Sequence, residues 1–371
     1  MKTILFLIPT LGHGGAEKVL TNLVNFLNKK EFDITVQTLF DEGINKQYLH
    51  QAVRYKTFLK HQFRGNSWLM MLFSPKALYK LIVKEHYDIV VSFLEGPTAR
   101  IVAGCPFADT KIISWFHTAP QTIKDFKVGF LTKQLAVKSY ARLNTIVCVS
   151  KEVKEALTRI SDYFKSNTTV LYNVIDSEYI KSKSLEPAED MQRDTKVPIV
   201  VSVGKLDPVK GYDRLLKTHK RLIDEGLTHA LYIIGTGSQK KTLQQYIESN
   251  NLSNTATLMG LKENPYKYLA KADLFVCSSL REGFSTAVTE ALILGVPVVS
   301  TMVSGANELL GEKNEYGIVV ENSEEGLYKG IKQMLESAEV RNYYAEQAKR
   351  RGSKFKTKET VSAVEELLRD A

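Results

Sequence analysis

The chain has 371 residues, of which 44% are apolar and 25% are charged, and its formal net charge is +9. This length favours two domains that each bury their own core, and the composition is typical of a globular protein. No apolar run reaches the ~18 residues of a membrane-spanning helix, so we predict none. The positive excess lies mainly in residues 1–190, with 25 basic and 18 acidic side chains, against 25 and 23 in residues 191–371.

The N-terminus and the cysteines indicate the cellular compartment. In MKTILFLIPTLGHGG the apolar run ends at Pro9 without a small-residue cleavage pattern, so a buried strand over 3–9 is favoured over a signal peptide. Cys105, Cys148 and Cys277 lie in or beside apolar runs and lack the spacing of metal ligands. We interpret them as reduced core residues of a cytosolic protein.

A loop with several glycines follows this strand and leads into an amphipathic helix. Gly12 and Gly14 fit the dinucleotide-binding pattern G-x-G-x-x-G, but Glu17 stands at its third position. Glycines in such a loop either let the backbone approach a ligand or make a tight turn, and the residues alone leave both roles open.

Strands and helices alternate through the first half of the chain. Further strands are predicted near 33–39, 53–58, 88–93, 111–116, 145–149 and 168–172. This alternation predicts an α/β fold with a doubly wound parallel sheet. His117 directly follows one of these strands, at the end where such sheets bind ligands. A single histidine is more often structural, so both roles stay open for it, and His13 in the glycine loop is a second candidate.

Two segments of the first half combine basic with bulky apolar side chains. Residues 46–84 contain eight lysines and arginines and no acid, and residues 124–142 form a second basic segment. Such a pattern suits an anionic membrane surface, nucleic acid, or an ordinary solvated surface with core anchors. Nucleic acid is disfavoured, because the chain has no recognised binding module and the rest of its charge is nearly balanced.

The second half opens after a polar, acidic segment, 177–196, which we interpret as an interdomain linker. A buried strand then leads to Gly204, and Lys205 and Lys210 follow it. Because cations at the carboxyl end of a parallel strand face the ligand, both lysines are suited to neutralise a diphosphate. A later strand leads into a glycine turn at 235–237.

The most informative stretch is 273–301, DLFVCSSLREGFSTAVTEALILGVPVVST. It predicts a buried strand, a polar loop, a helix with Ser285 as its N-cap, and a second buried strand. The amides at Gly283, Phe284 and Ser285 are expected to face an anion, because a helix N-terminus at this end of a strand favours negative charge.

Two carboxylates bracket this anion site, Glu282 in the loop and Glu290 in the helix. Carboxylates are poor phosphate ligands but accept hydrogen bonds from vicinal hydroxyls, which suggests a sugar ring on each side of a phosphate pair. The residues therefore favour a nucleotide sugar. The alternative interpretation is that Glu282 is an ordinary acid of the loop and Glu290 a solvated residue of the helix, and that neither binds a ligand.

The stretch R-E-G-F-S-T-A-V-T-E-A-L resembles the E-x7-E signature of the family 4 retaining glycosyltransferases. The resemblance implies the GT-B fold, in which two Rossmann-like doubly wound domains face each other across a cleft. It further implies an acceptor-side domain over 1–176, the linker over 177–196, a nucleotide-sugar domain over 197–354, and a C-terminal helix over 355–371 that crosses back to the first domain.

The resemblance also implies roles for individual residues. The expected catalytic residues are Glu282, which contacts the donor hexose, His117, which binds a sugar hydroxyl, and Lys210. Lys205 replaces the arginine of the family pattern, which keeps the charge but loses the bidentate fork. The residues expected to bind the donor are Gly14, Gly15, Gly204, Lys205, Lys210, Gly235, Gly237, Leu261, Glu282, Gly283, Phe284, Ser285 and Glu290, the last of them at the ribose.

The sequence therefore predicts a retaining glycosyltransferase that moves a hexose or N-acetylhexosamine from a nucleotide diphosphate sugar, with UDP as the expected carrier, to a lipid-linked saccharide. We expect no metal and no cofactor, since lysines and amides can stabilise the leaving diphosphate. The expected setting is polysaccharide or glycoconjugate biosynthesis in the cytoplasm, peripherally at the inner face of the cell membrane, with residues 46–84 and 124–142 on the anionic surface. The alternatives are a nicotinamide dehydrogenase, a nucleotide-sugar epimerase of the same fold and a non-catalytic polysaccharide-assembly partner.

Overall fold

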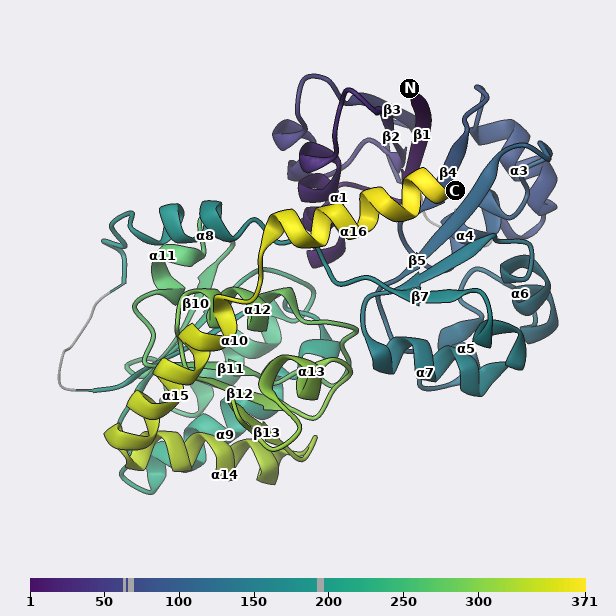
Figure 1. The fold of residues 1–371 in the computed structure, drawn as a ribbon. Helices are drawn as coiled ribbons and strands as arrows, with labels where there is room; N and C mark the ends of the chain where they lie inside the picture. The colour runs from purple at the N-terminus through teal and green to yellow at the C-terminus, as the bar shows by residue number, and fades with distance from the viewer. Residues whose placement is uncertain (63–64, 66–69, 192–196) are drawn as a thin grey trace. The chain divides into compact units, whose positions relative to one another are not determined.

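The computed structural model describes residues 1–62, 65, 70–191 and 197–371, which form two compact units (Figure 1). The first unit comprises Met1–Val174 together with Thr357–Ala371, and the second comprises Ile175–Lys356. Each unit has a sheet of parallel strands with helices between them. Because the helical crossovers cover both faces of such a sheet, its strands are buried and read as continuous apolar runs.

In the described part of the first unit, seven parallel strands form a sheet in the order β3-β2-β1-β4-β5-β6-β7. They are β1 (Lys2–Ile8), β2 (Phe32–Phe40), β3 (Arg54–Leu59), β4 (Ile89–Ser92), β5 (Lys111–Phe116), β6 (Thr145–Cys148) and β7 (Thr168–Val170). β2 pairs with one side of β1 and β4 with the other, so the strand order reverses between β1 and β4. Doubly wound sheets bind ligands at this reversal.

Helices connect these strands, and four of the described α-helices take their N-caps from Ser or Thr. The helices are α1 (Gly15–Phe26), η1 (Ile44–Tyr48), α3 (Pro75–Ile82), α4 (Pro97–Val102), α5 (Ile123–Phe126), α6 (Lys133–Tyr140), α7 (Lys151–Ile160) and η2 (Asp162–Lys165). Ser74, Thr122, Thr132 and Ser150 each accept a hydrogen bond from the backbone amide three residues on, which fixes the starts of α3, α5, α6 and α7.

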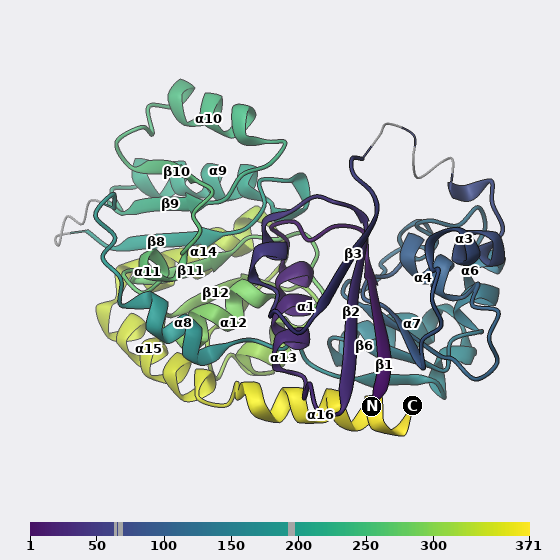
Figure 2. The ribbon, with the colours of Figure 1, turned by 90° about the horizontal axis from the view of Figure 1, so that it is seen from above.

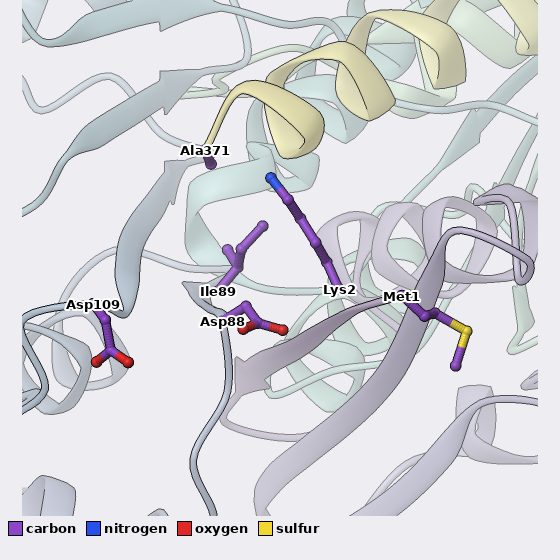
Figure 3. A pocket seen from close by; sticks show the side chains of 6 residues that line it. All are labelled: Met1, Lys2, Asp88, Ile89, Asp109 and Ala371. Atoms are coloured by element: carbon purple, nitrogen blue, oxygen red, sulfur yellow. The ribbon is translucent and has the colours of Figure 1, made fainter.

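The C-terminal helix α16 (Thr357–Asp370) belongs to the first unit. Glu365 Oε1 accepts a 2.8 Å hydrogen bond from the Asn28 amide, and Arg369 forms an ion pair with Glu31. Lys2 Nζ donates to the Leu368 carbonyl at 3.3 Å, which places a cation at the negative end of the helix. Figure 3 shows Lys2 reaching toward Ala371 beside an open pocket of about 350 Å³ that Asp88, Ile89 and Asp109 also line.

In the described part of the second unit, six parallel strands follow the order β10-β9-β8-β11-β12-β13, of which Figure 2 labels β10, β9, β8, β11 and β12. They are β8 (Ile199–Val203), β9 (Ala230–Ile234), β10 (Ala256–Gly260), β11 (Leu274–Cys277), β12 (Val298–Thr301) and β13 (Ile318–Val320). The helices are α8 (Ser177–Ser184), η3 (Pro208–Lys210), α9 (Tyr212–Asp224), α10 (Lys240–Ser249), α11 (Tyr266–Leu269), α12 (Thr286–Ile293), α13 (Ala306–Leu310), α14 (Glu324–Glu336) and α15 (Ala338–Gly352). The predicted α/β fold with two doubly wound parallel sheets is confirmed.

Helix α8 lies within the segment 177–196 that was expected as a linker, and it belongs to the second unit. Residues 192–196 of that segment lie outside the described residues. Across the described ranges, no helix combines the length and the apolar character that crossing a membrane requires.

A buried pair of histidines joins α9 to the loops before β9 and β10. His219 Nδ1 lies 2.8 Å from His229 Nε2, His219 Nε2 lies 2.9 Å from Thr255 Oγ1, and His229 Nδ1 lies 2.7 Å from the Leu227 carbonyl. The carbonyl can only accept, so His229 donates to it and its Nε2 accepts from His219. Burial, with a smaller effect of His229, lowers the pKa of His219 to about 3, and burial also lowers the pKa of His229. Both rings are therefore neutral at pH 7.

This pair predicts acid-sensitive stability. Because the folded pKa of His219 lies below the ordinary value of 6.5, its contribution is complete above that pH and is lost as the pH falls toward about 3. Between pH 7 and pH 5 the loss is about 2 kcal/mol for this residue. Urea denaturation at pH 7 and at pH 5 gives the free energy of unfolding at each pH. In His219→Gln, the difference between these two free energies should be smaller than in the wild type by about 2 kcal/mol. Thr255→Val removes a hydrogen bond but no titrating group, so its unfolding free energy should change between the two pH values as much as that of the wild type. An equal change in the wild type and both variants would contradict the prediction.

Candidate active site

Two loops meet at the point where the strand order of the second sheet reverses. β8 pairs with β9 on one side and with β11 on the other. Gly204 and Lys205 directly follow β8, Lys210 ends the short helix η3, and Glu282 lies in the loop between β11 and α12. Most of the predicted donor-site residues of this unit are therefore gathered at the carboxyl ends of adjacent strands, as ligand sites of such sheets are.

A buried arginine ties these two loops together. Arg214 in α9 is only 8% exposed, and its Nε and Nη2 donate to the Ser278 carbonyl at 2.9 and 2.6 Å. Nη2 also donates to the Ser279 carbonyl at 2.7 Å. Burial lowers the pKa of Arg214, while the nearby Asp213 opposes the shift. The guanidinium thus fixes the first two peptides after β11 to α9, whose N-cap Gly211 directly follows Lys210.

Further hydrogen bonds between the two loops reinforce this connection. Ser278 Oγ donates to the Lys210 carbonyl at 2.9 Å, and the Leu280 amide donates to the Val209 carbonyl at 2.7 Å. Gly211, between the lysine and the helix, has φ = 64°, and a β-carbon there would collide with the Ser278 carbonyl. Only glycine combines this backbone conformation with such close packing.

Lys210 and Glu282 form an ion pair within this arrangement. Lys210 Nζ lies 2.7 Å from Glu282 Oε1, and the two side chains are 28% and 13% exposed. Ser279 Oγ donates to the same carboxylate oxygen at 2.6 Å. Burial acts to lower the pKa of Lys210, but the Glu282 carboxylate outweighs it and the pKa is raised. The lysine therefore carries a positive charge at physiological pH.

Lys205 differs from Lys210 in its exposure. Its side chain is 69% exposed and its Nζ lies 3.0 Å from Asp207 Oδ2. Asp207 also accepts a 3.1 Å hydrogen bond from Ser238. Burial acts to raise the pKa of Asp207, but the hydrogen bonds from Lys205 and Ser238 lower it overall. Lys205 is thus a solvated cation in the loop that follows β8.

The predicted glycines of the β9–α10 turn lie against this same loop. Gly235 has φ = 152°, and a β-carbon on it would collide with the Gly204 carbonyl. The Leu206 amide donates to the Thr236 carbonyl at 2.9 Å, which holds the two loops in contact. Gly204, Gly235 and the turn up to Gly237 therefore form one packed backbone layer, and Leu261 follows β10 with its side chain 46% exposed.

Helix α12 begins at the second predicted anion-binding element. Ser285 is its N-cap and accepts a hydrogen bond from the Val288 amide at 3.4 Å. Glu290, in the same helix, is 6% exposed, and its Oε1 lies 3.3 Å from the Tyr266 hydroxyl, which donates to it. The alternative interpretation of Glu290 as a solvated helix position is therefore wrong.

The remaining predicted site residues belong to the first unit. Gly14 is the N-cap of α1 and Gly15 its first residue, and the Glu17 carboxylate lies against Gly14 at this helix start. Asn45 donates a hydrogen bond to the Gly12 carbonyl of the same loop. The Glu17 side chain thus packs against the backbone of this loop, and the donor-binding role of Gly14 and Gly15 stays a prediction.

His117 follows β5 and packs at 5.0 Å against the Phe93 ring. Its Nε2 is buried and has no hydrogen-bond partner among the described residues. Burial lowers the pKa of His117 to about 3, while a hydrogen bond to the Phe93 backbone acts in the opposite direction. Because that bond uses the other ring nitrogen as the donor, Nε2 is left as an acceptor, which suits an O–H donor such as a sugar hydroxyl.

Glu95, which the sequence interpretation missed, holds the backbone of this histidine. Its Oε2 accepts a 2.9 Å hydrogen bond from the His117 amide. Burial raises the pKa of Glu95, although hydrogen bonds from His117 and Thr118 oppose the shift. Its place directly after a predicted strand, the rule applied to His117, was a signal that pointed to it.

Comparison with known proteins decides the family. Residues 13–179 match the family described as "Glycosyltransferase Family 4", and residues 186–351 match the family described as "Glycosyl transferases group 1". A relative of 30% identity covers 99% of this chain and 100% of its own length; it is the N-acetylgalactosamine-N,N'-diacetylbacillosaminyl-diphospho-undecaprenol 4-alpha-N-acetylgalactosaminyltransferase of Campylobacter jejuni. The chain belongs to the family 4 glycosyltransferases.

A second relative and a solved structure agree with this assignment. The glycosyltransferase is 27% identical to the UDP-Gal:alpha-D-GlcNAc-diphosphoundecaprenol alpha-1,3-galactosyltransferase of Escherichia coli, over 85% of this chain and 82% of the relative. The crystal structure of Anabaena Alr3699/HepE in complex with UDP and glucose superposes with a TM-score of 0.81 at 19% identity and covers all of both chains. This likeness shows that the glycosyltransferase has the GT-B fold.

Among the described residues of the glycosyltransferase, no group of three or more His, Cys, Asp or Glu side chains is arranged to hold a metal ion. Most of the predicted site residues of the second unit lie at neighbouring strand ends, whereas Gly14, Gly15 and His117 lie in the first unit. Arg214 was missed, although it stands four residues before the buried Thr218 and eight before the buried Leu222 on the same helix face.

Arg214 offers a test of how the site is held together. Arg214→Lys keeps the charge but loses the fork that binds two carbonyls, so we expect a loss of about 2 kcal/mol in stability and weaker nucleotide binding. Arg221→Lys is the matched control, because Arg221 lies in the same helix but is 46% exposed and pairs with Glu225 and Glu325. Thermal unfolding and calorimetric titration measure both effects, and similar behaviour of the two variants would contradict the assignment.

Proposed function

We propose that this glycosyltransferase moves a hexose or N-acetylhexosamine from a UDP-sugar to a lipid-linked saccharide, with retention of configuration and without a metal ion. The observation that carries the proposal is the ion pair of Lys210 and Glu282 at the carboxyl ends of β8 and β11. Lys205 lies in the same loop as Lys210, and Glu290 is buried in α12, the helix that follows the loop of Glu282. Cations of this kind and the amides of a helix N-terminus bind a diphosphate, and the carboxylates accept hydrogen bonds from the hydroxyls of the sugar and the ribose.

In the proposed reaction, the bond between the anomeric carbon and the diphosphate oxygen breaks, and the acceptor hydroxyl oxygen forms a new bond to that carbon. The acceptor proton passes to the departing diphosphate. Negative charge grows on the diphosphate in the transition state, so Lys210, Lys205 and the amides at the start of α12 stabilise it. Well-placed donors of this kind contribute about 3–4 kcal/mol each.

The relatives support the choice of acceptor. The proteins from Campylobacter jejuni and Escherichia coli are both named for sugars carried on undecaprenol diphosphate, and the second is named for a UDP-sugar donor. We therefore propose a saccharide on a polyprenyl diphosphate as the acceptor. No observation favours an epimerase, a dehydrogenase or a non-catalytic partner.

Retention is proposed to proceed by attack on the face from which the diphosphate departs. A double displacement needs a carboxylate nucleophile at the sugar and a second carboxyl group close to it. Glu282 is already held by Lys210 and Ser279, and Glu290 is buried beside Tyr266 and assigned to the ribose. The departing diphosphate is then the base that takes the acceptor proton.

The donor site is tested by a thermal-shift panel of nucleotide sugars and Glu290 variants. A ligand at about 100 times its dissociation constant stabilises the protein by about 2.7 kcal/mol. Glu290→Gln should weaken binding of the best nucleotide sugar by about 10–100-fold, because it loses charge-assisted hydrogen bonds to the ribose. Glu312→Gln, an exposed acid of the same unit, is the control. Unchanged donor affinity in Glu290→Gln would remove the basis of the proposal.

The chemical course is tested with the purified enzyme, a UDP-sugar and a polyprenyl diphosphate saccharide. We expect full activity in excess EDTA, and an NMR spectrum in which the new glycosidic bond has the anomeric configuration of the donor. Loss of activity with EDTA that Mg²⁺ restores would contradict metal independence. An inverted product, or a trapped glycosyl adduct on Glu282, would contradict the same-face course.

We propose further that the first unit docks on anionic membrane through parts of residues 46–84 and 124–142. Exposed apolar side chains support this, with Leu72 at 63%, Leu131 at 58% and Val128 at 54% exposure. Arg100 holds the backbone at Met70 and Phe73, with carbonyl distances of 2.8 and 2.6 Å, which keeps this apolar segment in place. Helices α3, α4 and α6 lie side by side in both views (Figures 1 and 2).

Only some of the described basic residues in these segments are free to contact an anionic membrane. Lys46, Arg54 and Lys56 form ion pairs with Asp41, Asp33 and Glu85, so their charges are already balanced. Lys76 and Lys80 on α3 are exposed, next to the exposed Leu72 and Leu81. Arg64, which the basic segment also includes, lies outside the described residues.

Vesicle binding tests this surface. Each basic side chain near an anionic leaflet contributes about 1 kcal/mol, so Lys76→Glu with Lys80→Glu should weaken binding to phosphatidylglycerol vesicles more than tenfold. Lys240→Glu with Lys241→Glu, which reverses two exposed lysines on α10 of the second unit, should have little effect. Sedimentation with vesicles measures both, and equal losses for the two double variants would refute the docking surface.

A further inference from the structure

We infer that Glu282 makes binding of the donor diphosphate depend on the attached sugar, and that renewal of its ion pair with Lys210 favours release of the nucleoside diphosphate after transfer. The inference rests on the proposed function, since it assigns Lys210 to the diphosphate and Glu282 to the sugar. It adds a selection between substrate and product to that site.

The ion pair with Glu282 occupies the ammonium group of Lys210, which is the group proposed to bind the diphosphate. Lys210 Nζ and Glu282 Oε1 are 2.7 Å apart, and their side chains are 28% and 13% exposed. A diphosphate that binds Lys210 must share or replace this carboxylate. The carboxylate would then face phosphate oxygens of like charge while largely shielded from water, which is costly unless new donors reach it.

The carboxylate is fixed in position and has little freedom to turn away. Ser279 Oγ donates to Glu282 Oε1 at 2.6 Å, and the Ser279 carbonyl is itself held by Arg214 at 2.7 Å and by Thr301 Oγ1 at 2.6 Å. Both polar contacts of Glu282 fall on Oε1, and its Oε2 makes no hydrogen bond with any described residue. Oε2 is thus the oxygen that accepts from an incoming hydroxyl.

The hydroxyls of the donor sugar can replace the Lys210 ammonium group as hydrogen-bond donors to the Glu282 carboxylate. These hydroxyls donate to Glu282 while the diphosphate takes over Lys210, so both members of the pair exchange one partner for another. A nucleoside diphosphate without the sugar frees Lys210 in the same way but leaves Glu282 uncompensated. The site therefore prefers the substrate, and once the sugar has been transferred, the carboxylate competes with the product for Lys210.

The neighbouring ion pair lacks this property and provides the control. Lys205 and Asp207 are 3.0 Å apart, but the lysine is 69% exposed and Asp207 is 27% exposed. Water can therefore solvate both groups when a phosphate parts them, and exposed pairs contribute little. Asp207→Asn removes one negative charge from the same loop region and leaves the Glu282 contacts in place.

The test is calorimetric titration of the wild type, Glu282→Gln and Asp207→Asn with UDP, GDP and the matching nucleotide sugars. We expect Glu282→Gln to bind the nucleoside diphosphate roughly tenfold more tightly than the wild type, and to lose most of the preference for the sugar-bearing ligand. Asp207→Asn should change the nucleoside diphosphate affinity less than about threefold. Ser279→Ala, which keeps every charge but releases the carboxylate, should shift the affinity in the same direction as Glu282→Gln by a smaller factor.

Equal or weaker binding of the nucleoside diphosphate by Glu282→Gln would overturn the inference, and so would an equally large gain in Asp207→Asn. Either result leaves the proposed function intact, since the wild type would still bind the donor. Absence of binding of every nucleotide and nucleotide sugar by the wild type would overturn the proposed function, and the inference with it.

Discussion

The candidate donor site of this glycosyltransferase depends on one buried guanidinium. Arg214 binds the carbonyls of Ser278 and Ser279 and thereby fixes the loop that carries Glu282 to the helix that follows Lys210. The two residues come from loops about 70 positions apart in the chain, yet their charged atoms lie 2.7 Å from each other. Without that connection, neither strand end alone would define where the lysine and the carboxylate meet. The geometry of the candidate site therefore relies on a residue that is not itself one of the predicted site residues.

The backbone around this site is packed closely enough to limit what the sequence can change. Gly211 adopts a left-handed conformation against the Ser278 carbonyl, and Gly235 lies directly against Gly204. In both places a side chain would push apart loops that carry site residues. Glycine patterns in such folds thus have two explanations, access for a phosphate and contact between neighbouring loops, and here the second is visible in the structure itself.

The alternation of apolar runs and amphipathic helices was sufficient to predict the doubly wound sheet of the first unit, and the resemblance to the family 4 glycosyltransferases implied the second one. The sequence also located the loop of Glu282 and the helix of Glu290, since strand, polar loop and N-cap follow one another there. The ion pair between Lys210 and Glu282 could not be predicted, because it depends on the strand order that places β8 beside β11. Arg214 and Glu95 were missed for a related reason. The role of each side chain is identified by the carbonyls and amides around it, which the sequence does not show, although the place of Glu95 after a predicted strand did mark it as a candidate.

The composition of the first unit from two separate stretches of chain bears on how the protein is synthesised. Residues 175–356 form the second unit as one continuous segment, whereas the first unit is completed only by Thr357–Ala371, whose Val361, Val364 and Leu368 are buried. On the ribosome, the first 174 residues emerge early but lack the helix that covers part of their core. The nascent chain therefore lacks the contacts of these three side chains while the second unit is translated, and partly folded chains of this kind are prone to aggregation.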